Sequence, residues 1–200
     1  MTRTIRVLQS AALRWLSLSL CIAVCAALTG CTPYEFTMGS RHITRCSVLT
    51  SLAGVDQGTR YATLRDTAAI DMNYYGATQY LLTMDVKAMR GEGFRVLLRP
   101  VVEQRAVIDS GLILTVTNEG TTLVEHGTLR ARRPDVVIRP GQQMHLSLLS
   151  ENGYLQIALG CDTVFKGTSA IKESDDVVVQ ALERSEVQLI QPDWSGLPDR

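Results

Sequence analysis

The sequence contains few of the residue patterns that identify enzymes, metal proteins or nucleic-acid-binding proteins. Its 20 basic residues equal its 20 acidic residues, so no basic excess favours nucleic acid as a partner. Its three histidines are widely spaced, and neither a His-x-His nor a Cys-x-x-Cys pair is present to predict a metal site. Gly-x-Ser-x-Gly and phosphate-loop motifs are also missing. The sequence therefore predicts no metal, no cofactor and no catalytic residue.

Long apolar runs are scarce, and the one near the start of the chain, Leu16 to Leu28, has only 13 residues. A helix that crosses a bilayer needs roughly 20. The residues before the run include Arg3, Arg6 and Arg14 and no acid. A basic start, a short apolar run and then small residues are typical of a secretory signal peptide.

The apolar run ends in Leu28-Thr29-Gly30-Cys31, which resembles the lipobox of bacterial lipoproteins. The resemblance implies cleavage before Cys31, which would then carry acyl chains such as palmitate. Several acyl chains anchor a protein stably in a membrane. Because Thr32 follows rather than an aspartate, we expect the outer membrane, on its periplasmic or surface face, rather than the inner one. The alternatives are an ordinary signal peptide and an uncleaved anchor.

Removal of residues 1–30 would leave 170 residues, the size of one domain. The loss of three arginines would leave 17 basic residues against 20 acidic ones. We expect residues 31–42 to form the lipidated N-terminus and a tether. Residues 43–191 would form the domain, and residues 192–200 an exposed C-terminal tail.

The mature part of the chain is a series of short runs in which apolar and polar residues alternate. In one of them, three apolar residues alternate with two arginines: Phe94, Arg95, Val96, Leu98 and Arg99. Turn-forming residues separate the runs at a spacing of roughly ten residues. This pattern predicts an all-β fold, an antiparallel sandwich or barrel.

The turn at Asn152-Gly153 gives the sharpest local prediction. Asn-Gly suits a two-residue type I′ turn, because both central residues of that turn need positive φ. The turn pairs Leu148 with Ile157 and places the aliphatic side chains of both strands on one buried face. A shift of one residue would scatter these side chains, so the turn and the pattern agree.

Three stretches carry a wider resemblance: Tyr80–Met89 with Gly91–Arg99, Gly141–Leu148, and Tyr154–Gly160. The first looks like two paired strands with a glycine turn between them, the second like a later core strand, and the third like a strand before a tight turn. Together they resemble concanavalin A-like jelly rolls, including laminin G-like domains, over roughly residues 68–190. The resemblance implies a two-sheet sandwich with a curved sheet whose concave face often binds glycans or proteins. Another β-sandwich is the alternative fold.

The cysteines predict a disulfide. If Cys31 is lipidated, Cys46 and Cys161 remain, and two cysteines in an oxidising compartment suggest a bridge. The bridge would close a loop of over a hundred residues, which the chain-entropy model values at about 4–5 kcal/mol. The alternative is a pair of buried free thiols.

Arg95, Arg99 and Thr115 are the candidate ligand-binding residues, because the alternation places them on outward faces of adjacent strands. A second candidate is a basic cluster, made of Arg130, Arg132, Arg133 and Arg139. It could meet anionic glycans or lipid headgroups, or it could be a solvated hairpin that discourages pairing at a sheet edge.

Catalysis has weaker support in the sequence. Glycoside hydrolysis normally needs two carboxylates in a facing geometry. The glycosidases of the concanavalin A-like superfamily carry them in a Glu-x-Asp-x-x-Glu run, which this sequence lacks. Four acids are present in the strand region, and we interpret them as solvated turn residues: Asp71, Asp85, Glu103 and Asp109.

Together, these observations predict a non-enzymatic lipoprotein of the bacterial cell envelope. Its β-sandwich would bind a glycan or another envelope protein, and its lipid anchor would hold it at a membrane. The alternatives are a glycan-cleaving hydrolase with an unrecognised carboxylate pair and a structural subunit of an envelope assembly. A structural subunit would show a large exposed apolar patch.

Overall fold

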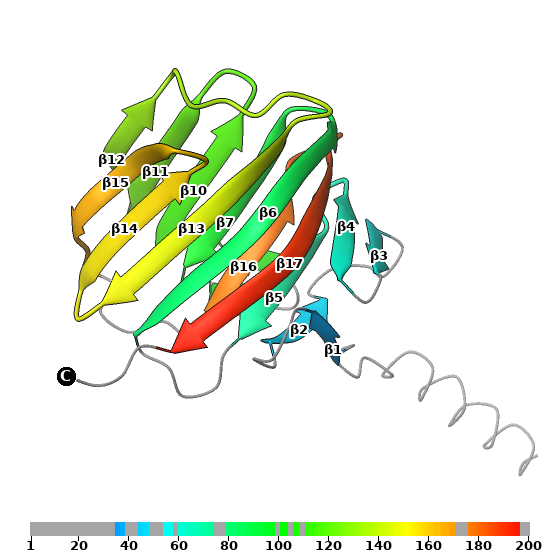
Figure 1. Ribbon diagram of the computed structural model, residues 1–200, viewed down its shortest axis with the longest axis horizontal. Helices are drawn as coiled ribbons and strands as arrows, with labels where there is room; N and C mark the ends of the chain where they lie inside the picture. Colours follow the sequence, from blue (N-terminus) through cyan, green and yellow to red (C-terminus); the bar gives the residue numbers. More distant parts are fainter. Residues whose placement is uncertain are drawn as a thin grey trace, which may run out of the picture. The chain divides into compact units, whose positions relative to one another are not determined.

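Alternation of apolar and polar residues gives the described part of the chain an almost entirely β-stranded structure (Figure 1). The computed structural model describes residues 35–38, 44–48, 54–57, 60–73, 79–98, 101–103, 106–108, 111–170 and 176–196. All of them belong to one unit, Glu35–Arg200. The predicted signal peptide and lipobox lie outside the described residues. No helix in the described part is long and apolar enough to cross a membrane.

The described strands form two large antiparallel sheets and a small hairpin. Sheet A has the order β1 (Glu35–Met38), β2 (Thr44–Val48), β5 (Ala69–Asn73), β16 (Asp176–Ala181), β7 (Gly93–Leu98), β10 (Leu112–Thr117), β11 (Thr121–Glu125), β12 (Thr128–Arg133). Sheet B has the order β15 (Asp162–Thr168), β14 (Tyr154–Leu159), β13 (Gln143–Glu151), β6 (Tyr80–Arg90), β17 (Glu186–Gly196), β4 (Tyr61–Arg65), β3 (Val55–Gln57). The hairpin pairs β8 (Val101–Glu103) with β9 (Ala106–Ile108).

The two sheets pack face to face around one hydrophobic core, with sheet B in front in Figure 1. Strand β6 shows the principle, because every second residue from Tyr80 to Ala88 is buried and the residues between them are half-buried. Phe94 and Val96 from sheet A join the same core. The predicted all-β antiparallel sandwich is therefore confirmed.

The turn between β6 and β7 differs from the prediction. The resemblance treated these strands as a pair, but β6 lies in sheet B and β7 in sheet A, so the chain crosses between the sheets at Gly91 and Glu92. The Ser185 hydroxyl holds this crossing by accepting hydrogen bonds from the backbone N–H groups of Glu92, at 2.9 Å, and Gly93, at 3.1 Å. Gly93 has a φ of 148°, and a Cβ there would lie 2.0 Å from the Val116 carbonyl oxygen. The crossing therefore depends on glycine.

The β13–β14 hairpin is confirmed. Asn152 and Gly153 have φ values of 50° and 78°, as a type I′ turn requires. Glu151 pairs with Tyr154, and the register continues as predicted along both strands. The inward aliphatic residues are almost fully buried: Leu146, Leu148, Leu155, Ile157 and Leu159.

The sandwich extends beyond the expected domain limits at both ends. Strand β1 lies within the expected tether, and β17 continues to Gly196, inside the expected exposed tail. Trp194 is 0% exposed and packs on Tyr80, with 4.6 Å between the ring centroids. An irregularity in the pairing between Ile190 and Asp193 lets Pro192 lie within this long strand. Residues 192–196 are thus part of the domain, because the Trp194 side chain belongs to the hydrophobic core.

The predicted Cys46–Cys161 bridge is not formed. Cys161 is an exposed free thiol beside β15. Cys46 belongs to β2, which is six strands away from β12, the strand that contacts β15. Six interstrand spacings amount to roughly 29 Å, whereas the Cα atoms of a disulfide lie within about 7 Å of each other. The sheet order therefore separates the two cysteines.

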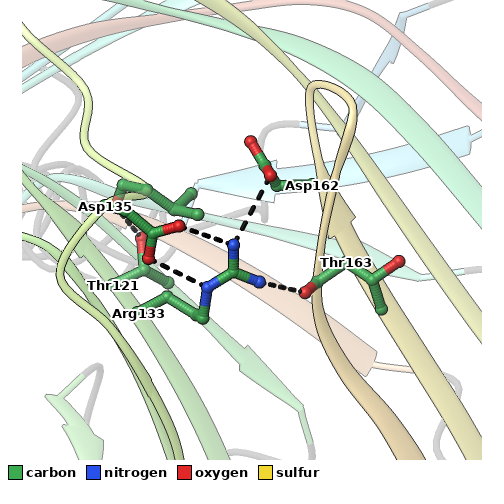
Figure 2. A network of polar contacts seen from close by, with 6 residues as sticks. Thr121, Arg133, Asp135, Asp162 and Thr163 are labelled. Atoms are coloured by element: carbon green, nitrogen blue, oxygen red, sulfur yellow. Dashed lines mark hydrogen bonds and ion pairs between the residues drawn. The ribbon is translucent and has the colours of Figure 1, made fainter.

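Two arginines of β12 connect the edge of sheet A to the edge strand β15 of sheet B. Arg133 forms a two-pronged pair with Asp135, at 2.9 and 2.7 Å, and donates to the Thr163 carbonyl at 2.6 Å (Figure 2). Its guanidinium also lies 3.4 Å from Asp162. Arg133 lowers the pKa of Asp135 to about 2 through these hydrogen bonds. We call this contact between β12 and β15 the arginine seam.

Arg130 makes the second half of the arginine seam. It donates to the Thr168 carbonyl at 2.8 Å, lies over the Phe165 ring, and pairs with Glu125. Glu125 is buried, and it also accepts hydrogen bonds from the Ser169 hydroxyl and from the Ala170 N–H, the latter at 2.8 Å. Burial raises the pKa of Glu125, but the two hydrogen bonds and the Arg130 charge outweigh it, so that the pKa lies below its ordinary value.

The first prediction concerns the C-terminal strand. Trp194→Ala should lower the free energy of unfolding by about 3–5 kcal/mol, because it empties a fully buried site. Met89→Ala is the matched control, since that large apolar side chain is 43% exposed and should cost less than about 0.5 kcal/mol. Denaturant unfolding of the full chain measures both. Equal, small effects would mean that residues 192–196 are an exposed tail.

The second prediction concerns the arginine seam. Glu125→Gln should lower the free energy of unfolding by about 1–3 kcal/mol at pH 7, because it leaves Arg130 without its charged partner. A carboxyl whose folded pKa is lowered stabilises the fold above its unfolded pKa, and that stability is lost as the pH falls through the folded pKa. The difference between wild type and variant should therefore shrink below about pH 4.5. Unfolding curves at pH 7 and pH 3.5 test this, and a difference independent of pH would contradict it.

Candidate functional site

A row of polar side chains crosses the outer face of sheet A, which is the face opposite the core. It occupies directly paired positions on five neighbouring strands, β16, β7, β10, β11 and β12. We call these residues the polar row: Gln180, Arg95, Thr115, Thr122 and Arg132. Their neighbours in sequence point the other way, as Phe94 and Val96 do on either side of Arg95.

The structure brings two of the three predicted residues together. Arg95 and Thr115 point outward, as the alternation predicted, and they are cross-strand partners on the neighbouring strands β7 and β10. Arg99 lies outside the described residues. The sequence analysis did not include Gln180, Thr122 or Arg132 in this group. Alternation within each strand indicates their face, but only the strand order shows that they are neighbours.

The Arg95 side chain is held in a defined orientation. Its Nε donates to the Gln180 Oε1 at 2.7 Å. The Gln180 Nε2 in turn donates to the Thr67 carbonyl at 2.9 Å. Gln180 is buried, so the carboxamide that orients the guanidinium is itself fixed at both ends. These two hydrogen bonds fix the direction of the Arg95 guanidinium relative to sheet A.

A hollow with a volume of about 220 Å³ lies over β10, β11 and the end of β12. Three members of the polar row line it, together with residues of the β10–β11 turn and its surroundings. The lining residues are Thr115, Thr117, Glu119, Gly120, Thr121, Thr122, Arg132 and Pro134. Most small-molecule pockets have roughly 300–1,000 Å³. The hollow therefore suits one part of a ligand that continues along the polar row.

The β10–β11 turn that borders the hollow is well ordered by local hydrogen bonds. The Thr117 hydroxyl donates to the Gly120 carbonyl at 2.9 Å and accepts from the Glu119 N–H at 3.2 Å. Gly120 has a φ of 145°, and a Cβ there would come within 3.0 Å of the Pro134 Cα. A glycine is thus required where the turn passes close to the segment after β12.

A small apolar cluster borders the polar row on the same face of sheet A. Ala69, Leu97 and Val178 are fully buried there, and Ile113 packs against them. Leu97 and Ile113 are each two residues from a member of the polar row on the same strand. This explains why β7 and β16 carry continuous aliphatic runs, since both of their faces are buried in this region.

The predicted basic cluster is divided among different roles. Arg130 and Arg133 form the arginine seam, whereas Arg132, which lies between them in the sequence of β12, belongs to the polar row. Arg139 is exposed in the segment before β13. The cluster therefore does not act as one unit. Arg132 and Arg133 are neighbours in the strand and point to opposite faces, and a register shift opposite Leu123 and Val124 leaves Arg130 unpaired in β12 and out of the alternation.

The outer face of sheet B carries a separate polar group. The His145 Nδ1 lies 2.8 Å from Asp85 Oδ1, and Gln143 Nε2 donates to the other carboxylate oxygen at 2.9 Å. The hydrogen bonds among His145, Asp85 and Gln143 are exposed to solvent. Within the part of the chain that the structure describes, no group of three or more His, Cys, Asp or Glu side chains is arranged to hold a metal ion.

No protein-family model and no curated protein sequence matches the chain. Solved structures do resemble it. The carbohydrate-binding module CBM66 from Bacillus subtilis has a TM-score of 0.59 at 13% identity, covering 80% of this chain and 100% of that one. A protein of unknown function with a galectin-like fold, also from Bacillus subtilis, has a TM-score of 0.56 at 11% identity, covering 78% and 90%.

The exoplasmic/lumenal domain of VIP36, in its Ca²⁺/Man-bound form, has a TM-score of 0.50 at 10% identity, covering 74% of this chain and 82% of that domain. At such identities the likeness concerns the fold. The chain is a two-sheet antiparallel sandwich of the jelly-roll, galectin-like kind. Because one fold can host many functions, what the chain binds has to be inferred from its surface residues.

Proposed function

We propose that this protein is a lipid-anchored protein of the bacterial cell envelope whose β-sandwich binds a glycan without cleaving it. The polar row and its hollow, on the outer face of sheet A, would be the binding surface. The observation that carries this proposal is the alignment of Thr115, Thr122 and Arg132 on neighbouring strands, where all three line the hollow.

The chemistry of the surface suits sugar hydroxyl groups. Each hydroxyl both donates and accepts, and so do the hydroxyls of Thr115 and Thr122, whereas arginine supplies donors only and a carboxylate acceptors only. Glu119 offers such a carboxylate at the turn end of the hollow. An open hollow on a sheet face can hold one part of an extended chain of sugars. The names of CBM66 and of the Ca²⁺/Man-bound VIP36 domain support the choice of ligand class.

The alternatives have less support. Among the described residues that line the hollow, Glu119 is the single carboxylate, whereas a glycosidase normally uses two. A structural subunit should show a large apolar patch. The large exposed apolar side chains of the described part are Tyr61, Met89 and Leu129, and they belong to β4, β6 and β12, none of which are neighbours in a sheet. A protein partner of the envelope, rather than a glycan, is an outcome of the tests below.

Anchoring rests on the sequence alone. The lipobox Leu28–Cys31 supplies the lipidation site, and Thr32 favours the outer membrane over the inner one. A lipid anchor and a glycan-binding surface on one chain would hold the protein between a membrane and a polysaccharide of the envelope. The expected partners are thus the membrane and a glycan.

The third prediction tests the binding surface. Thr115→Val should weaken binding of a glycan identified on an array by about two- to tenfold, because it removes one hydrogen-bonding hydroxyl and keeps the side-chain shape. Thr83→Val is the matched control, since Thr83 is a half-buried outward residue of sheet B. Titration calorimetry of the full chain in detergent compares the two. An array without any bound glycan, or equal effects of both variants, would refute the proposed surface.

The fourth prediction tests the anchor. Labelled palmitate supplied to an expressing bacterium should enter the wild-type chain and Cys25→Ser, but it should not enter Cys31→Ser. The label should separate with outer membranes on a density gradient. Label in Cys31→Ser would exclude lipidation at that residue, and label in inner membranes alone would refute the expected location.

A further inference from the structure

We propose that the hollow binds the end of a saccharide chain, with the terminal sugar over Thr115 and Thr122 and the rest of the chain leaving the sheet over Arg132. This inference rests on the proposed function and names its ligand class, which is chain ends rather than chain interiors. Its starting point is the exposure of the polar row, which differs between the two ends of the row.

The exposure of the polar row increases from β16 to β12. Gln180 on β16 is buried, and Arg95 on β7 is half-buried and bonded to it at 2.7 Å. Thr115 and Thr122 are half-buried at the wall of the hollow, and Arg132 on the edge strand β12 is exposed. A ligand can therefore reach the row at β10, β11 and β12.

The outer face of sheet A is closed to a ligand on the β7 side of the hollow. Ala69 on β5 is directly paired with Gln180 and is fully buried. Leu97 and Val178 pair with each other two residues further along their strands, and they are fully buried outside the main core. Because solvent does not reach these positions, a saccharide over Thr115 cannot continue across β7 and β16.

The hollow is also closed at the β10–β11 turn. The Thr117 hydroxyl donates to the Gly120 carbonyl at 2.9 Å, and a Cβ on Gly120 would lie 3.0 Å from the Pro134 Cα. The turn therefore passes so close to the segment after β12 that a saccharide cannot run between them.

Two directions remain, and hydrogen bonding favours the one over Arg132. Away from the turn, the next directly paired residues on β10 and β11 are Ile113 and Val124, and Ile113 packs against the buried cluster of Leu97 and Val178. Aliphatic side chains offer a sugar no hydrogen-bond donor or acceptor, whereas a guanidinium offers five N–H donors. The chain thus follows the row over Arg132 and leaves at the sheet edge.

The polar groups on the wall of the hollow suit a terminal sugar. Within the part of the chain that the structure describes, the side chains of Thr115, Thr122 and Arg132 form no hydrogen bond or ion pair with another residue. The Thr121 hydroxyl, in contrast, donates to the Val136 carbonyl at 2.6 Å. A terminal sugar has a free hydroxyl where an internal sugar has a glycosidic bond, and a hydroxyl both donates and accepts. A volume of about 220 Å³, below the usual range for ligand sites, suits one such unit.

Titration calorimetry of the full chain in detergent tests binding to chain ends. The probe is the glycan with the strongest signal on the array, prepared as short, medium and long oligomers by partial acid hydrolysis of its parent polysaccharide. One protein molecule should bind per saccharide chain at every length, with affinities that agree within about twofold. A number of bound protein molecules that rises with chain length would overturn the proposal.

Reduction of the short oligomer with borohydride identifies the bound end, because it opens the ring of the reducing-end sugar and leaves the other end intact. With one protein molecule per chain, an affinity that falls by about tenfold or more assigns the reducing end. An unchanged affinity at the same stoichiometry assigns the non-reducing end.

Two variants test how the chain lies. Thr115→Val should weaken binding of the short oligomer and of the methyl glycoside of its terminal sugar by the same factor, about two- to tenfold. Arg132→Gln should weaken the oligomer by a similar factor and leave the methyl glycoside unchanged, because a single sugar does not extend over β12. Saturation-transfer NMR measures the methyl glycoside. Arg139→Gln is the matched control, since Arg139 is exposed and outside the polar row, and thermal unfolding shows that each variant is folded.

The outcomes distinguish this inference from the function on which it rests. If several protein molecules bind each long chain, chain-end specificity is wrong and glycan binding stands. If the methyl glycoside does not bind, or if Arg132→Gln weakens it as much as the oligomer, the proposed position of the chain is wrong. If no saccharide on the array binds, the proposed function itself fails.

Discussion

Burial of one face of each sheet against the other is the constraint on which the remaining features of this molecule depend. It commits every second residue of strands such as β6 and β10 to the core. The residues between them face outward, where packing does not determine their identity. Outward positions such as Thr115 and Thr122 can therefore carry polar side chains, because the core behind them is already complete.

A two-sheet sandwich also has edges, and the arginine seam closes one of them. Strand β12 ends sheet A and β15 ends sheet B, and unpaired edge strands are prone to pair with other chains. Arg130 and Arg133 instead bind backbone carbonyls of β15. The same strand turns Arg132 to the outer face. One short basic segment thus supplies both a structural contact and a member of the candidate site.

The comparisons place the fold among sandwiches that include a carbohydrate-binding module, but a shared fold hosts many functions. The proposed function therefore depends on the residues of the polar row. The buried carboxamide of Gln180 links that surface to the scaffold, because it joins Arg95 to the backbone at Thr67. An arginine held by a strand and by a fixed neighbour can select ligands more sharply than one on a loop.

Local sequence determined the features that depend on a few neighbouring residues. The Asn152-Gly153 turn, the register of its hairpin and the outward direction of Arg95 and Thr115 all follow from turn geometry and two-residue alternation. The predicted lipidation site is local in the same sense. Tertiary structure decided the features that depend on strand order. It placed β6 and β7 in different sheets, separated Cys46 from Cys161, buried Trp194, and inserted β16 beside β7 so that Gln180 reaches Arg95. Pairing between segments far apart in the chain depends on how the two sheets fill one core, and alternation within each strand carries no information about which strand will be its neighbour.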